Sequence, residues 1–226
     1  MYLPRYLLLS ALVAVTILQT VSAREPDLQT GEDINEVCAG CHGVNGEGGK
    51  NGEYPRLAGQ PYRFLYEQMI LFQERHRPNL AMIEHVDKRQ MPPEDVQDIS
   101  AYLASIQLPT RLEPVDDKAP GFDALARLQA ARRVMQIPRA EGDVEAGGRL
   151  YRRECASCHG RDGMGDPDGI TPMLAGQYTA YLWRQVPKYI DKVRIHDPDS
   201  PEDPLLDQFS EAELRDIFAY VSTLDD

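Results

Sequence analysis

A six-residue pattern occurs twice in this chain and constrains everything around it. Residues 38–43 read CAGCHG and residues 155–160 read CASCHG. The pattern C-x-x-C-H is typical of covalent haem attachment, because two thiols one helical turn apart can each add to a haem vinyl group while the histidine faces the iron. We therefore expect two covalently bound c-type haems (heme c). The expected haem-holding residues are Cys38, Cys41, Cys155 and Cys158, and the expected proximal iron ligands are His42 and His159.

A zinc site and a redox dithiol are the alternative explanations of two C-x-x-C pairs. Zinc-binding pairs usually lie much closer in sequence than the 117 residues that separate Cys38 from Cys155. A redox dithiol needs no histidine after its second cysteine and usually lies in a β-α-β pattern, which this sequence lacks. Haem attachment is therefore the preferred interpretation of both motifs.

The two motifs belong to a longer internal repeat. At a constant offset of 117 residues, Gly31 pairs with Gly148, Pro55 with Pro172, and the LAGQ segment 57–60 with 174–177. Near the carboxyl ends the offset becomes 118, where DISAY at 98–102 matches DIFAY at 216–220. The repeat indicates duplication of one domain, with a single-residue change of length in the loop between these blocks.

Each copy is expected to be all-α, with three helices joined by loops. The first helix should end at the haem motif, the second should begin after LAGQ, and the third should close the domain. One face of each closing helix is apolar, formed by Val96, Ile99, Tyr102, Leu103 and Ile106 in the first copy and by Leu214, Ile217, Val221 and Leu224 in the second. The start signals are Pro92 and Pro93 in the first copy and a capping box of Ser210 with Glu213 in the second.

The amino terminus has the pattern of a secretory signal peptide. Arg5 gives a positive start, a short apolar run follows, and Val21-Ser22-Ala23 is a small-residue cleavage site. An uncleaved membrane anchor is the alternative, but the apolar run is shorter than the roughly 20 residues that span a bilayer. Haem attachment to thiols belongs outside the bacterial cytoplasmic membrane, so we expect an exported, periplasmic protein with no stable membrane span after cleavage.

The expected organisation is a signal peptide at 1–23, a first domain at 24–108, a linker at 109–145 and a second domain at 146–226. The linker has its own helical pattern from Phe122 to Met135, with Leu125 and Leu128 apolar and Arg127 basic. We prefer a helix that clamps the two domains together. A docking surface for a partner enzyme is the alternative.

The chain is strongly acidic. Its formal net charge is −12, and cleavage of the signal would remove Arg5 and make the mature chain one charge more negative. This balance disfavours nucleic acid and anionic membranes as partners. We find no proton-transfer or nucleophilic constellation, so we predict no catalytic residues and expect an electron carrier rather than an enzyme.

The doubled motif, the P-x-L-A-G-Q segments and the D-I-x-A-Y closing helices resemble the two-domain dihaem cytochromes of the cytochrome c4 type. The cytochrome subunit of flavocytochrome c sulfide dehydrogenases looks similar too. The resemblance covers residues 31–106 and 148–224. It implies two tandem class I cytochrome c domains, each haem held by a histidine and a methionine, passing single electrons in the periplasm. It also implies that the carbonyls of Pro55 and Pro172 accept the Nδ1 protons of His42 and His159.

The sixth iron ligand in the first copy has two candidates. The family places an axial methionine on the loop before the closing helix, where this chain has Met82 and Met91. Met91 aligns with Phe209 of the second copy, a position suited to a hydrophobic staple. We therefore predict Met82 as the ligand and keep Met91 as the alternative.

The second copy has no methionine after Met173. Met164 lies too close in sequence to His159 to reach the other face of a porphyrin, and Met173 lies in the proximal segment. His196, in the Asp- and Pro-rich loop 191–207, is the best-placed substitute. A solvated loop histidine and an open iron site are the alternatives, with Lys188 and Lys192 as further candidates. Pro187 is expected to bend the second helix and re-aim this loop.

These observations predict a dihaem carrier of single electrons. Its partners would be redox proteins, a dehydrogenase or a terminal oxidase or reductase, and the chain could be the electron-accepting subunit of such a complex. The competing hypothesis is a catalytic haem enzyme that acts on a small sulfur, nitrogen or peroxide substrate at an open or exchangeable second iron.

Overall fold

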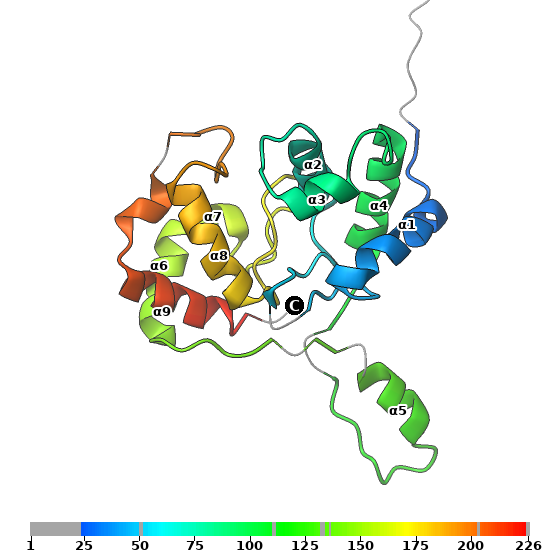
Figure 1. The fold of residues 1–226 in the computed structure, drawn as a ribbon. Coiled ribbons are helices and arrows are strands. Elements are labelled where there is room, and N and C mark those ends of the chain that lie inside the picture. Colours follow the sequence, from blue (N-terminus) through cyan, green and yellow to red (C-terminus); the bar gives the residue numbers. More distant parts are fainter. Residues whose placement is uncertain are drawn as a thin grey trace, which may run out of the picture.

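The computed structural model describes residues 24–49, 52–109, 112–131, 134–135, 137–202 and 204–224. The expected signal peptide lies outside these ranges. Figure 1 shows two helical lobes side by side, with one short helix projecting from the connection between them. In the described residues the regular structure is helical apart from an isolated bridge between Gly49 and Tyr54. The all-α prediction is therefore confirmed.

Each lobe corresponds to one copy of the repeat. The first lobe contains α1 (Leu28–His42), α2 (Tyr62–Gln73), α3 (Leu80–His85) and α4 (Pro93–Ser105). The second lobe contains α6 (Val144–Glu154), α7 (Ala156–His159), α8 (Thr179–Ile190), the 3₁₀ helix η2 (Leu205–Gln208) and α9 (Glu211–Val221). The helix α5 (Ala124–Ala131) lies in the connection.

The closing helices α4 and α9 pack across the haem-motif helices α1 and α6. Val96, Ile99 and Leu103 of α4 are at most 2% exposed, and Leu214, Ile217 and Val221 of α9 are at most 5% exposed. The capping box of Ser210 and Glu213 starts α9 as predicted, and Pro93 begins α4. The apolar face read from the sequence is thus the face that forms each core.

The two crossings are equivalent, and they correct the register of the repeat. Asp27 caps α1 and donates its backbone N–H to the Asp98 carboxylate; Asp143 caps α6 and donates in the same way to Asp216, both at 2.8 Å. The glycine four residues after each cap lies against the backbone of the closing helix, so closely that a Cβ would collide with a carbonyl oxygen. That glycine is Gly147 in the second lobe, so the pairing of Gly31 with Gly148 is wrong by one residue.

This register leaves one additional residue between the cap and the haem motif of the second lobe. Cys38 lies 11 residues after Asp27, whereas Cys155 lies 12 residues after Asp143. The helix absorbs the additional residue by a break: α1 runs without interruption through the motif to His42, but α6 ends before Cys155 and α7 begins after it. The helices α1 and α7 both end at the motif histidine, His42 or His159.

Pro187 does not re-aim the loop that follows α8, so this expectation is wrong. The helices α2 and α8 both have 12 residues and end at equivalent positions. Arg75 and Lys192, again equivalent, have positive φ values of 62° and 53°. Pro187 lies in the last turn and a half of α8, where the loss of one backbone donor leaves most of the helix bonded. The chain therefore takes the same course in both lobes up to Arg77 and Arg194.

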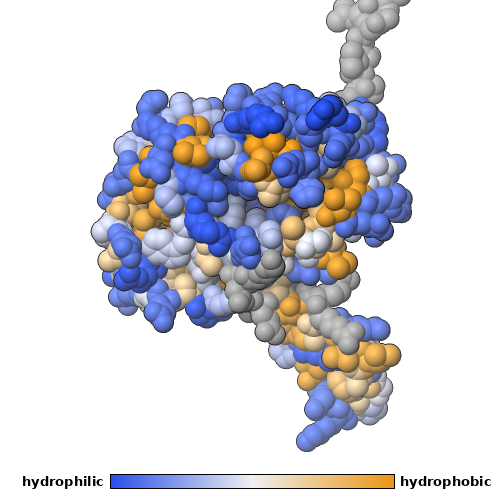
Figure 2. All heavy atoms as spheres, viewed as in Figure 1, coloured by the Kyte–Doolittle hydropathy of each residue, from blue (hydrophilic) through white to orange (hydrophobic). Residues whose placement is uncertain are grey.

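The helix α5 does not clamp the lobes, and the preferred interpretation of the linker is wrong. No residue of α5 is buried, and Leu125 and Leu128 are 64% and 51% exposed. The returning chain makes the contact instead: Met135, 4% exposed, packs with Ala58 and Leu108. Figure 2 shows apolar side chains on the surface of the projecting segment.

The corrected register predicts unequal costs for two neighbouring substitutions. Gly147→Ala would place a methyl group against the rigid backbone of α9, whereas at Gly148 a Cβ would meet the Tyr220 ring, at 2.9 Å. We expect Gly147→Ala to lower the free energy of unfolding by about 2–3 kcal/mol and Gly148→Ala by less. Denaturant unfolding of the haem-loaded protein measures both. Equal costs would contradict the register.

Candidate haem sites

The first haem motif forms the carboxyl-terminal turns of α1. Cys38 is partly buried and Cys41 is exposed, and both are free thiols. Residues three apart on a helix lie on the same side, so both thiols can reach one flat cofactor. Gly43 then ends the helix with φ 83°, and Gly160 does the same in the second lobe with φ 79°. These positive φ values favour glycine, which explains why each motif continues with it.

Both motif histidines bond to a proline carbonyl. The Nδ1 atom of His42 lies 3.0 Å from the carbonyl oxygen of Pro55, and Nδ1 of His159 lies 3.0 Å from that of Pro172. A carbonyl oxygen only accepts, so Nδ1 of each histidine carries the proton. The Nε2 atom of each ring is then the nitrogen that can bind a metal.

Burial keeps both histidines in the neutral form that binds iron. Burial lowers the pKa of His42, although the bond to Pro55 opposes this effect. Burial lowers the pKa of His159 to about 4; the bond to Pro172 opposes it, and the neighbouring His196 lowers the pKa further. Both rings are therefore neutral near pH 7, as metal ligation requires.

The described residues fit a haem at each motif better than they fit zinc. A zinc site needs several thiolate or imidazole ligands around one point. Within the described parts of the chain, no three His, Cys, Asp or Glu side chains gather in that way. Burial also raises the pKa of the Cys155 thiol to about 11, so this thiol is protonated near pH 7. Two thiols beside a neutral imidazole with a bonded Nδ1 are the donor set of a c-type haem.

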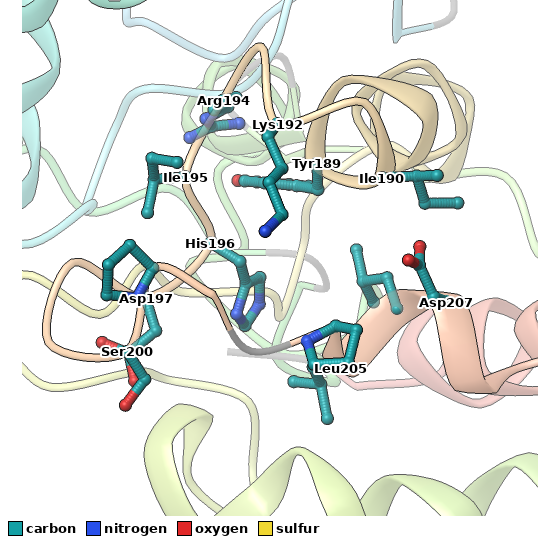
Figure 3. A pocket seen from close by; sticks show the side chains of 13 residues that line it. Tyr189, Ile190, Lys192, Arg194, Ile195, His196, Asp197, Ser200, Leu205 and Asp207 are labelled. Atoms are coloured by element: carbon teal, nitrogen blue, oxygen red, sulfur yellow. The ribbon is translucent and has the colours of Figure 1, made fainter.

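His196 lies next to His159, the predicted proximal ligand of the second lobe. Its ring centroid is 6.1 Å from that of His159, with 56° between the ring planes. The Tyr189 ring meets it edge-on at 5.3 Å. Figure 3 shows the His196 side chain in a pocket between the loop and η2, with Tyr189 on one side and Leu205 on the other.

The separation of the two imidazoles is compatible with one metal ion between them. Two histidines that bind one metal from opposite sides have ring centroids roughly 6 Å apart, since each metal–nitrogen bond is about 2 Å. The structure thus brings His159 and His196 together at a distance suited to one iron. The sequence indicated His196 because of its place in the loop before the closing helix. The structure adds that its ring lies at a distance from the His159 ring that suits one iron.

The two candidate methionines of the first lobe belong to one apolar cluster. Met91 is buried, and its carbonyl accepts a hydrogen bond from Gln73 at 2.9 Å. Met82, on α3, is partly buried against the same cluster, which also contains Phe72 and Val86. The equivalent of Met91, Phe209, likewise packs against the core of the second lobe. Met82 therefore stays the predicted ligand, with Met91 as the alternative.

The remaining methionines have other places in the fold. Met69 packs on the core of the first lobe, and Met135 is buried beneath the returning linker. Met173 is 2% exposed, at the contact between the lobes, whereas Met164 is 38% exposed.

Sequence reasoning missed two residues near the sites. Gln60 and Gln177 end the two LAGQ segments, and each is at most 5% exposed. Both side chains bond across the lobe interface to the backbone of the residue that follows Pro55 or Pro172. Their repetition at the same offset was the available signal, but it was read as part of the duplication.

Comparison with known proteins agrees with this geometry. The family model described as cytochrome c matches residues 29–107 and 144–225. A thiosulfate dehydrogenase electron acceptor of Thiomonas intermedia is 29% identical over 71% of this chain and 66% of its own length. Cytochrome c4 of Pseudomonas aeruginosa is 26% identical over 88% of this chain and 89% of its own length.

A solved structure has the same fold. Reduced cytochrome c4 from Pseudomonas stutzeri superimposes with a TM-score of 0.65 at 22% identity, covering 88% of this chain and 99% of that one. Two motifs that fit haem, two matched domains and this fold assign two covalently bound c-type haems to the chain. The chain belongs to the cytochrome c family, as a two-domain dihaem protein of the cytochrome c4 type.

Proposed function

We propose that this chain is an exported, periplasmic carrier of single electrons whose two haems have different axial ligands. The first iron would be held by His42 and Met82, and the second by His159 and His196. Electron transfer itself follows from the family and from its relatives. The unequal ligation, the export and the place of the chain in a complex are the proposal.

The distance between His159 and His196 is the observation that favours an electron carrier over a catalytic haem enzyme. A catalytic haem needs a coordination position that a substrate can occupy. A histidine ring 6.1 Å from the proximal ring would fill that position at the second iron. This arrangement supports a carrier, because the catalytic alternative would then need His196 to exchange for a substrate at the second iron.

The chain's own residues set the conditions for electron transfer. When bound, each haem supplies a one-electron couple. The proline carbonyls orient the proximal rings, and burial keeps them neutral. Methionine ligation raises a haem potential relative to histidine ligation. Electrons would therefore favour the first haem over the second, which gives the carrier a direction.

The relatives indicate the kind of partner. One of them is named as the electron acceptor of a thiosulfate dehydrogenase. We infer that this chain likewise accepts electrons from an oxidoreductase outside the cytoplasm. No helix in the described part of the chain has the length and apolar character to cross a bilayer. The acidic surface would suit a partner with basic residues around its own redox centre.

The ligation at the second iron can be tested by electron paramagnetic resonance of the oxidised protein. We expect two low-spin signals in the native chain and, in His196→Ala, replacement of one by a high-spin signal with uptake of carbon monoxide after reduction. His76→Ala removes another exposed histidine and is the matched control. Unchanged low-spin signals in His196→Ala would exclude His196 as ligand and direct the search to Lys188 or Lys192. Carbon monoxide binding by the native chain would favour the catalytic alternative.

The ligand of the first iron can be tested separately. Iron–thioether ligation gives a weak long-wavelength band in the oxidised visible spectrum, and we expect Met82→Ala to abolish this band and lower one of the two potentials. Met91→Leu should keep the band while lowering the free energy of unfolding by about 1 kcal/mol, because Met91 packs in the core. Loss of the band in Met91→Leu, with retention in Met82→Ala, would exchange the two roles.

A further inference from the structure

The contact between the lobes contains two buried amide side chains that act reciprocally. Gln177 accepts the backbone N–H of Arg56 through Oε1 at 3.0 Å and donates to the Arg56 carbonyl through Nε2 at 3.0 Å. Gln60 accepts the backbone N–H of Met173 at 3.0 Å and donates to its carbonyl at 2.9 Å. All four residues are at most 5% exposed. The two glutamines, like Arg56 and Met173, are 117 residues apart, so the contact has approximate twofold symmetry.

The bond that each glutamine accepts from a backbone N–H lies on the peptide unit that bonds to a motif histidine. The Pro55 carbonyl and the Arg56 N–H belong to one planar peptide group. The carbonyl accepts the Nδ1 proton of His42, and the N–H donates to Gln177. The same is true of Pro172 and Met173 with His159 and Gln60. Each lobe therefore places a glutamine on the far side of the peptide that orients the proximal ligand of the other lobe.

A hydrogen bond to the N–H end of a peptide strengthens its carbonyl as an acceptor. Bonds in such a chain polarise one another, by about 10–30% per bond. A stronger carbonyl acceptor draws the Nδ1 proton and makes the imidazole a more basic iron ligand. More basic ligation favours the oxidised iron and lowers the potential.

We propose that Gln60 and Gln177 are crossed positioning residues: Gln177 tunes the first haem through Pro55 and His42, and Gln60 tunes the second through Pro172 and His159. This inference rests on the axial roles of His42 and His159. It does not depend on which residue is the sixth ligand. The potentials of the two haems then depend on the contact between the lobes, because separation of the lobes would break both bonds.

The test compares Gln177→Leu and Gln60→Leu in the complete, haem-loaded protein. Nitrogen-15 labelling of the histidines allows the Nδ1–H resonances of His42 and His159 to be followed by NMR in the reduced state. We expect Gln177→Leu to shift the His42 signal upfield and to raise one potential in a spectroelectrochemical titration, while His159 stays unchanged. Gln60→Leu should shift the His159 signal and raise the other potential.

Two further variants separate tuning from general damage to the interface. Glutamate keeps an acceptor for the peptide N–H, so Gln177→Glu should shift the His42 signal downfield, opposite to Gln177→Leu. Gln68→Leu is the matched control, because Gln68 also bonds across the interface, to Arg194 at 3.1 Å, but touches neither proximal peptide. It should leave both histidine signals in place.

Shifts confined to the histidine of the substituted lobe would overturn the proposal. So would equal shifts of both histidines, shifts of one sign in the leucine and glutamate variants, or shifts in Gln68→Leu as large as those in Gln177→Leu. Crossed shifts in a protein whose second iron is not bound by His196 would support this inference while rejecting the proposed ligation, so the two ideas fail separately.

Discussion

The bond from each motif histidine to a proline carbonyl is the interaction on which both candidate haem sites depend. It joins the end of the motif helix to the P-x-L-A-G-Q segment, residues 55–60 or 172–177, and this segment leads directly into α2 or α8. The same segment forms the contact between the lobes, through Gln60 and Gln177. One short stretch in each copy therefore orients the ligand, starts the helix that leads to the distal loop and meets the other lobe.

The two lobes hold together through polar side chains in a buried setting. Arg194 donates to Gln68 of the first lobe at 3.1 Å, and Arg77 donates to the Tyr181 hydroxyl of the second at 3.0 Å. Burial lowers the pKa of Arg77, with the nearby Arg194 lowering it further. Buried polar groups are costly unless their partners are in place, so these bonds favour one relative placement of the lobes. That placement is the one in which each glutamine reaches the opposite peptide.

The sequence allowed prediction of the helices, the motif residues and the duplicated plan, because these depend on local patterns repeated in two copies. The register at Gly147 was missed because the constant offset of 117 selects the adjacent Gly148, and only the contact of Gly147 with the Asp216 backbone identifies the equivalent of Gly31. The role of α5 was missed because an amphipathic pattern shows which face could be buried, not whether a partner covers it. The role of the reciprocal glutamines was missed because their repetition shows only that they belong to the duplication, and their partners, backbone atoms of the other lobe, cannot be identified from side-chain patterns.

The proposed difference between the two iron sites lies where the copies diverge. The lobes share the motif, the proline carbonyl, the interface and the chain course up to Arg77 and Arg194, which lie over equivalent rings at 4.5 and 4.8 Å. Beyond these arginines the first lobe forms α3 with Met82, whereas the second forms the loop with His196 and then η2. A change of ligand in this distal loop alters one potential without disturbing the contact that holds both sites. With the proposed ligands, duplication followed by divergence in this loop would turn two equal haem domains into a carrier with a preferred direction.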